Sequence, residues 1–152
     1  MAYITEAEYE ALYGEIDTAE FERLAFDASR FMDTMTTGID NYRKLKSAMP
    51  TDEDDAEAVE MCCAKLISLM KSIESAEGFV AREDGTVVSK AVSSFSSGSE
   101  SMSFGGSSAV SAALSDINAR NKLYMDTVKS YLSGIEDANG VNLLYMGRYP
   151  NV

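Results

Sequence analysis

The chain has 152 residues, of which 45% are hydrophobic, and a formal net charge of −12 at pH 7. This length and composition predict one folded domain with a real core and argue against a disordered chain. The acidic balance argues against a grip on nucleic acid, which needs clustered Lys and Arg. It suits either general solubility or a surface that repels DNA.

No apolar run of the sequence is long enough to span a membrane, so no membrane association is predicted. The first residues, Met1 to Glu6, lack the charged and apolar regions of a signal peptide. We therefore expect the chain to stay in the cytoplasm of the cell that makes it.

Histidine is absent, and the only cysteines are the neighbours Cys62 and Cys63. Neighbouring side chains on a helix point about 100° apart, so we expect two reduced packing residues and no mutual disulfide. The missing histidine removes the Ser–His and Cys–His nucleophile pairs and leaves too few soft ligands for zinc. The composition therefore predicts no catalytic residue, no metal and no cofactor.

The first half of the chain predicts three helices, because apolar residues recur there at steps of three and four. They span residues 5–13, about 17–38 and about 51–76. Their expected caps and stops are Thr5 with Glu8 and Gly14, Asp17 or Thr18 with Glu20 and Gly38, and Thr51 with Gly78. The apolar stripes expected in the core are Phe21, Leu24, Ala28, Phe31 and Met35, then Val59, Cys62, Leu66, Met70 and Ile73.

The segment from Gly38 to Pro50 is ambiguous. It has helical spacing of apolar residues but is short and carries the densest positive cluster of the chain, Arg43, Lys44 and Lys46. This cluster is either a solvated basic loop or a contact for phosphate or an acidic partner.

The acidic run from Asp52 to Glu57 invites a calcium interpretation. An EF-hand loop needs glycine at its sixth position and glutamate at its twelfth, where this chain has Glu57 and Cys63. We instead expect a helix start, where carboxylates complement the positive end of the helix dipole.

Residues 86–104 predict a β-hairpin. Val87, Val88, Val92 and Phe95 favour a strand, Ser97-Gly98 reads as the turn, and the pattern then alternates. Gly105 to Ser108 favours a strand-to-helix turn over an anion-binding loop, because the Lys of a P-loop is missing.

A fourth helix should begin at Ser107 or Ser108 and weaken at Gly134. Its expected apolar face is Val110, Leu114, Ile117, Asn121, Tyr124, Val128 and Tyr131. After a turn at Asn139-Gly140, the chain leaves with an apolar run of Leu143, Leu144, Tyr145, Met146 and Tyr149. This run either docks on a partner, as an exposed apolar patch would, or packs on the chain's own bundle.

In order and motif, the chain resembles the head–tail connector (adaptor, or head completion) proteins of long-tailed bacteriophages. The residues that carry the resemblance are the capped helix pair Thr5 to Met35, Ala56 to Ala64, the serine-rich strand Val92 to Phe104, Tyr131-Leu132 and the run Gly140 to Gly147. The chain departs from the family pattern by longer segments at 38–50 and 79–91.

The resemblance implies a structural virion protein at the head–tail interface, assembled in the host cytoplasm. Family members form rings, commonly of twelve copies, that lie under the portal, extend the DNA channel and present a platform for the stopper or tail. Genomic DNA would pass without specific binding during ejection. By the same resemblance, the arm would touch the portal through Leu143, Leu144, Tyr145, Arg148 and Tyr149. The strand would meet a neighbouring subunit or the next ring through Phe95, Glu100, Met102 and Phe104.

We therefore expect a mainly α-helical bundle of three main helices and a short N-terminal helix. Residues 1–139 would form the domain with its β-hairpin excursion, and residues 140–152 an extended C-terminal docking arm. Two alternatives stay open: a small helical regulatory protein of phage or prophage origin that binds a partner, and an enzyme that uses paired carboxylates. An enzyme of this kind needs acidic residues clustered in one pocket, whereas here they are concentrated at the starts of the helices, which disfavours the enzyme.

Overall fold

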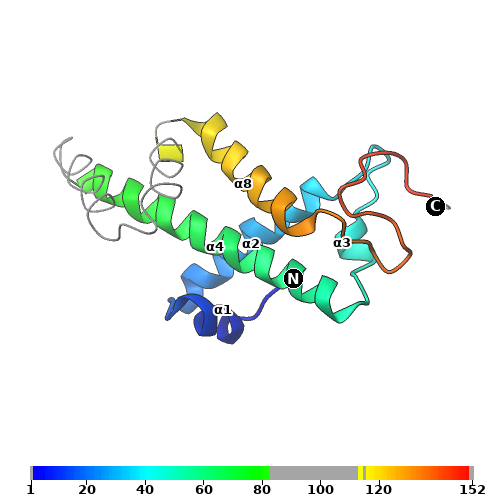
Figure 1. The fold of residues 1–152 in the computed structure, drawn as a ribbon. Coiled ribbons are helices and arrows are strands. Elements are labelled where there is room, and N and C mark those ends of the chain that lie inside the picture. The colour runs from blue at the N-terminus through cyan, green and yellow to red at the C-terminus, as the bar shows by residue number, and fades with distance from the viewer. Residues whose placement is uncertain (1, 83–112, 115, 151–152) are drawn as a thin grey trace. The chain divides into compact units, whose positions relative to one another are not determined.

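A computed structural model describes residues 2–82, 113, 114 and 116–150. The described part holds five helices and no strand: α1 (Glu6–Tyr13), α2 (Thr18–Met35), α3 (Lys44–Ser47), α4 (Glu53–Arg82) and α8 (Ile117–Leu132) (Figure 1). The prediction of a mainly helical chain is confirmed. The chain divides into two compact units, Met1–Ser68 with Met125–Val152, and Leu69–Tyr124, so α4 and α8 each contribute to both.

Helix α1 begins and ends as the sequence predicted. The Thr5 hydroxyl accepts a hydrogen bond from the Glu8 N–H at 3.3 Å, and the Glu8 carboxylate accepts one from the Thr5 N–H at 2.8 Å. The bonds from Thr5 lower the pKa of Glu8, as expected for a capping box. Gly14 follows the helix with a φ of +89°. The Tyr9 ring packs against Phe21, with 5.8 Å between centroids, so α1 lies along α2.

Helix α2 is capped by Asp17, whose Oδ1 accepts from the N–H groups of Ala19 and Glu20, both at 3.1 Å. It ends at Met35, three residues before the predicted stop at Gly38. The Thr37 hydroxyl donates to the Asp33 carbonyl at 2.6 Å, and the Thr37 N–H donates to the Thr34 carbonyl instead. A side chain that binds the last carbonyls in this way competes with the helix. The buried face is Phe21, Leu24, Ala25, Ala28, Ser29 and Met32, while the predicted core residues Phe31 and Met35 are only half-buried.

Helix α4 buries its whole predicted stripe, from Val59 to Ile73. Its start differs by one residue from the prediction: Asp52, and not Thr51, accepts from the N–H groups of Asp54 and Asp55, at 3.1 and 3.3 Å. The predicted stop at Gly78 is wrong, since the helix continues to Arg82. An interior glycine costs a helix only about 1 kcal/mol relative to alanine, which the rest of a long helix tolerates.

The two cysteines are free and buried in α4, as packing residues. Burial raises the pKa of Cys62 to about 12 and that of Cys63 to about 11. Both thiols are therefore protonated and unreactive at neutral pH.

In the unit Leu69–Tyr124, the last part of α4 meets the first part of α8 through an ion pair between Arg120 and Glu77. Arg120 Nε also donates to the Ala113 carbonyl at 3.2 Å. Asp116 caps α8 by accepting from the Asn118 N–H at 2.8 Å. On the predicted face, Tyr124 is buried but Ile117 is exposed.

The predicted hairpin over 86–104, with Phe95, Glu100, Met102 and Phe104, lies outside the described residues, as does the predicted helix start at Ser107 or Ser108.

Candidate docking site

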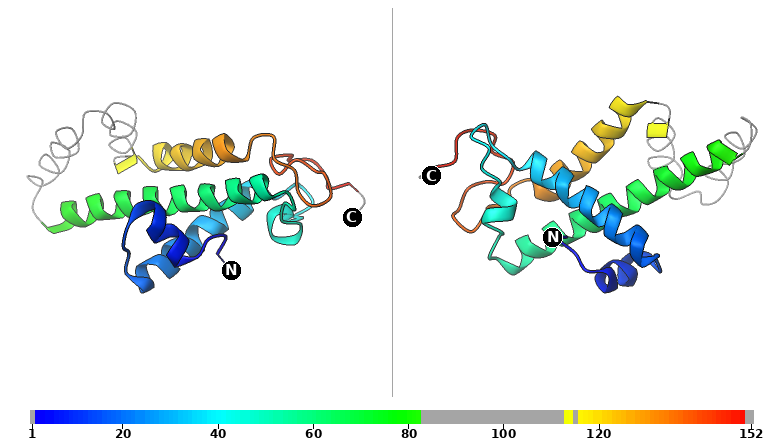
Figure 2. Two further views of the ribbon diagram at one scale, coloured as in Figure 1. Left: turned by 60° about the horizontal axis from the view of Figure 1, so that its bottom comes forward. Right: turned by 180° about the vertical axis from the view of Figure 1, so that it is seen from behind.

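Two loops of the unit Met1–Ser68 with Met125–Val152 lie side by side (Figures 1 and 2). The first loop, residues 36–43, joins α2 to α3, and the second loop, residues 133–149, follows α8. The Ile39 N–H donates to the Met146 carbonyl at 3.1 Å, and the Ala138 N–H donates to the Ala48 carbonyl at 3.1 Å. The C-terminal segment therefore folds back onto its own chain.

One aspartate organises each loop. Asp137, in the second loop, accepts from the N–H groups of Asn139 and Val141 at 2.9 and 3.0 Å, which fixes the turn that the sequence predicted at Asn139-Gly140. Asp40, in the first loop, accepts from the Tyr42 N–H at 3.2 Å and from the Tyr149 N–H at 2.7 Å. The bond from Tyr149 is the main cause that lowers the pKa of Asp40.

Tyr149 connects the two aspartates. Its hydroxyl donates to Asp137 Oδ2 at 2.7 Å and accepts from the Asn139 amide at 2.8 Å. Its ring packs on Tyr42 with 4.0 Å between centroids. Burial and the bond to Asp137 raise the pKa of the Tyr149 hydroxyl to about 12.

Lys44, at the start of α3, is only 1% exposed. Its ammonium donates to the Tyr145 carbonyl and lies 5.8 Å from the centroid of the Tyr145 ring, within cation–π range. Burial lowers the pKa of Lys44, and the nearby Asp137 and Asp40 oppose that shift. A lysine is almost never fully buried unless it is paired, and here Lys44 ties the start of α3 to the second loop.

The structure corrects the predicted extended arm. Leu143 is 0% exposed and Tyr149 is 6% exposed, so neither is free to dock on a partner. The physical reason is hydrogen bonding within the chain: the Leu143 N–H donates to the Ile135 carbonyl at 2.9 Å, and the polar groups of Tyr149 find partners in both loops. Of the other predicted docking residues, Leu144 is half-buried, whereas Tyr145 and Arg148 are exposed.

Three large apolar side chains remain exposed where the loops meet: Ile39 at 77%, Tyr145 at 49% and Met146 at 52%. We call Ile39, Tyr145 and Met146 the apolar tip. Ile39 belongs to the segment from Gly38 to Pro50, which the sequence alone left ambiguous. The signal that marks it as a loop residue is its position between Gly38 and Asp40-Asn41, a run typical of turns. Contiguous exposed apolar surface usually marks an interaction site.

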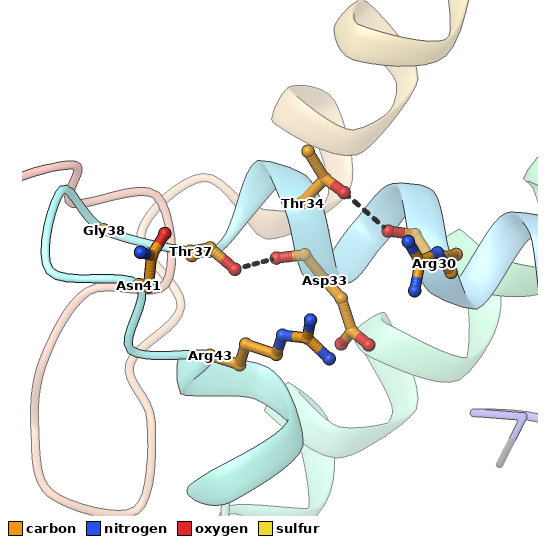
Figure 3. A pocket seen from close by; sticks show the side chains of 7 residues that line it. All are labelled: Arg30, Asp33, Thr34, Thr37, Gly38, Asn41 and Arg43. Carbon is orange, nitrogen blue, oxygen red and sulfur yellow. Dashed lines mark hydrogen bonds between the residues drawn. The ribbon is translucent and has the colours of Figure 1, made fainter.

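A polar cleft of about 390 Å³ lies beside the first loop, lined by Arg30, Asp33, Thr34, Thr37, Gly38, Asn41 and Arg43 (Figure 3). We call it the arginine cleft. The hydroxyls of Thr34 and Thr37 donate to the carbonyls of Arg30 and Asp33, at 2.9 and 2.6 Å. Figure 3 shows Arg43 and Asp33 pointing toward one another across the cleft. The Asp33 carboxylate also accepts a hydrogen bond from the Tyr3 hydroxyl.

No family model, curated protein or solved structure matches this chain. Its function is therefore inferred from its own residues.

The described residues contain no group of three or more Cys, Asp or Glu side chains placed to hold a metal ion. Within the same part of the chain, every helix is too short or too polar to cross a bilayer.

Proposed function

We propose that the chain is a structural adaptor of a long-tailed bacteriophage, which joins the portal to the stopper or tail and extends the DNA channel as a ring of copies. The apolar tip is the observation that carries this proposal. It is an exposed apolar surface held on two mutually braced loops, and it contains Tyr145, a residue of the motif that resembles the connector family.

The braced loops suit a docking surface for a physical reason. Binding loses less conformational entropy when the contact residues are already ordered. Lys44 donates to the Tyr145 carbonyl and the Ile39 N–H donates to the Met146 carbonyl, which orders the backbone of the tip. Asp40 and Asp137 hold the neighbouring Tyr149. The tip would therefore meet the portal as a preformed knob and not as a strand that orders on contact.

The residues that we propose to face the portal therefore differ from those predicted from the sequence. Tyr145, Met146 and Ile39 would supply the apolar contact, and the exposed Arg148 would supply a charge at its rim. Leu143 and Tyr149 would support the tip from beneath. A ring repeats this contact on each copy, so many weak contacts sum through avidity.

The experiment is co-purification of the chain with the portal protein encoded by the same phage genome. Replacement of Ile39→Asp together with Met146→Asp should abolish capture by the portal and leave the fold intact, because both side chains are exposed. Phe26→Asp, at an exposed apolar residue of α2, is the matched control and should be captured normally. Normal capture of the tip variant would refute the proposed surface. Point substitutions are preferable to removal of residues 140–152, which would also remove the buried Leu143 and Tyr149.

The regulatory alternative uses the same tip differently. A small partner-binding protein would form a complex of one or two copies with a host or phage factor. An adaptor would place many copies on one portal ring, so the stoichiometry of the complex separates the two functions.

A further inference from the structure

We infer that the arginine cleft of one copy binds the acidic start of α4 on a neighbouring copy. The inference rests on the proposed ring and adds a subunit contact to it. The arginine cleft and the start of α4 both belong to the unit Met1–Ser68 with Met125–Val152, so each copy of the chain carries both surfaces.

The cleft presents two exposed cations. Arg30 and Arg43 are exposed, and neither forms an ion pair within 4.0 Å with another described residue. Asp33 is the single carboxylate of the lining; it faces Arg43 and accepts a hydrogen bond from the Tyr3 hydroxyl, so the two arginines leave the lining with a net positive charge. Guanidinium groups bind carboxylates through paired, parallel hydrogen bonds, so the cleft is suited to receive acidic side chains.

The start of α4 offers the matching anions. Glu53, Asp54 and Glu57 are exposed and form no ion pair with other described residues. Asp52 caps the helix by accepting from the N–H groups of Asp54 and Asp55, so it orders the backbone that carries the other carboxylates. Glu53 and Glu57 are four residues apart and therefore share one face of the helix.

A second copy fits this cleft better than an unrelated partner does, because of charge. Each copy has a formal charge of −12, so copies repel one another unless their few cations lie at the contacts. A ring also needs a head-to-tail interface, in which two different patches of the same chain meet. The arginine cleft and the start of α4 are two such patches with opposite charge.

A charge swap tests the contact. Variant one carries Arg30→Glu and Arg43→Glu, and variant two carries Glu53→Arg, Asp54→Arg and Glu57→Arg. Sedimentation equilibrium of the full chain, alone and with its portal protein, measures self-association at low and high salt. Each variant alone should self-associate at least about tenfold more weakly than the native chain at low salt, because like charges then face each other. An equal mixture of the two should recover association, since every contact again joins opposite charges.

The control is Lys129→Glu, an exposed lysine outside the cleft with the same change of charge per substitution, and it should associate like the native chain. The inference is overturned if neither variant weakens association or if the mixture does not recover association. It is also overturned if native copies fail to associate both alone and with the portal protein. It is also overturned if variant one loses only affinity for DNA, which would make the cleft a phosphate contact.

The two proposals fail separately. If the mixture recovers association but the chain does not bind portal, the subunit contact stands and the adaptor function falls. If the chain binds portal in many copies whatever the charge of the cleft, the function stands and the contact falls.

Discussion

The Tyr149 hydroxyl donates a 2.7 Å hydrogen bond to the carboxylate of Asp137, twelve residues earlier in the chain. Asp137 is 5% exposed and uses its other oxygen to hold the turn after α8. Through its N–H, Tyr149 also reaches Asp40 in the first loop. One residue near the C-terminus thus closes the structure that supports the apolar tip.

Replacement of Tyr149 by phenylalanine should lower the free energy of unfolding by about 1–3 kcal/mol. The ring would still pack on Tyr42, but Asp137 would lose a donor while it stays buried. Urea unfolding followed by circular dichroism measures the change. Tyr145→Phe is the control and should stay within about 0.5 kcal/mol of the native chain, because Tyr145 is half exposed. Equal losses in the two variants would mean that the bond to Asp137 adds nothing.

The same hydroxyl predicts a loss of stability in alkali. The pKa of Tyr149 is about 12 in the folded chain against an ordinary 10.0, so the folded state keeps a proton that the unfolded state releases. The stabilising contribution is complete below pH 10.0 and disappears as the pH rises through about 12. The measurement is the unfolding free energy of the native chain and of Tyr149→Phe across this range. The difference between them should shrink as the pH rises, and a constant difference would contradict the assignment.

Lys44→Met should loosen the second loop. Methionine fills a similar volume but removes the hydrogen bond to the part-buried Tyr145 carbonyl, a loss of about 1 kcal/mol. Hydrogen exchange should become faster at the amides of Leu143 and Tyr149, which bond Ile135 and Asp40. Lys46→Met, at an exposed neighbour on α3, is the control and should leave these amides protected. Unchanged exchange in the Lys44 variant would show that the lysine does not brace the loop.

Gly38→Ala should destabilise the contact between the loops. A Cβ at Gly38 would lie 2.5 Å from the Gly147 carbonyl oxygen, a backbone atom that cannot swing aside. Overpacking of this kind costs about 1–3 kcal/mol, which thermal unfolding would detect. Its neighbour Ile39→Ala should unfold like the native chain, because the Ile39 side chain is exposed. A native melting temperature for the Gly38 variant would mean that the loops separate easily.

The helices were predictable because their signals are local. The Thr5–Glu8 box, the Asp17 cap and the stripe of α4 each lie within a few turns of the residues that they order. The errors in the helices also have local causes: the Thr37 hydroxyl binds the carbonyl that would continue α2, and Gly78 is too weak a breaker to end α4.

The support of the site could not be predicted in the same way. Lys44 and Tyr145 are 101 positions apart, and Asp40 and Tyr149 are 109 apart, so no periodicity in the sequence relates them. Apolar composition marked residues 143–149 as a candidate interface, but it did not say which side chains the chain would bury itself. Which of these side chains is buried depends on whether its backbone and hydroxyl groups find hydrogen-bond partners in the other loop.

The most direct test of the account is to mix the chain with the proposed partner, the portal protein, and to measure the mass of what forms by native mass spectrometry. The account predicts many copies on one portal ring for the native chain and bare portal for Ile39→Asp with Met146→Asp. A native chain that leaves the portal bare, or that forms only a complex of one or two copies with another factor, would contradict it.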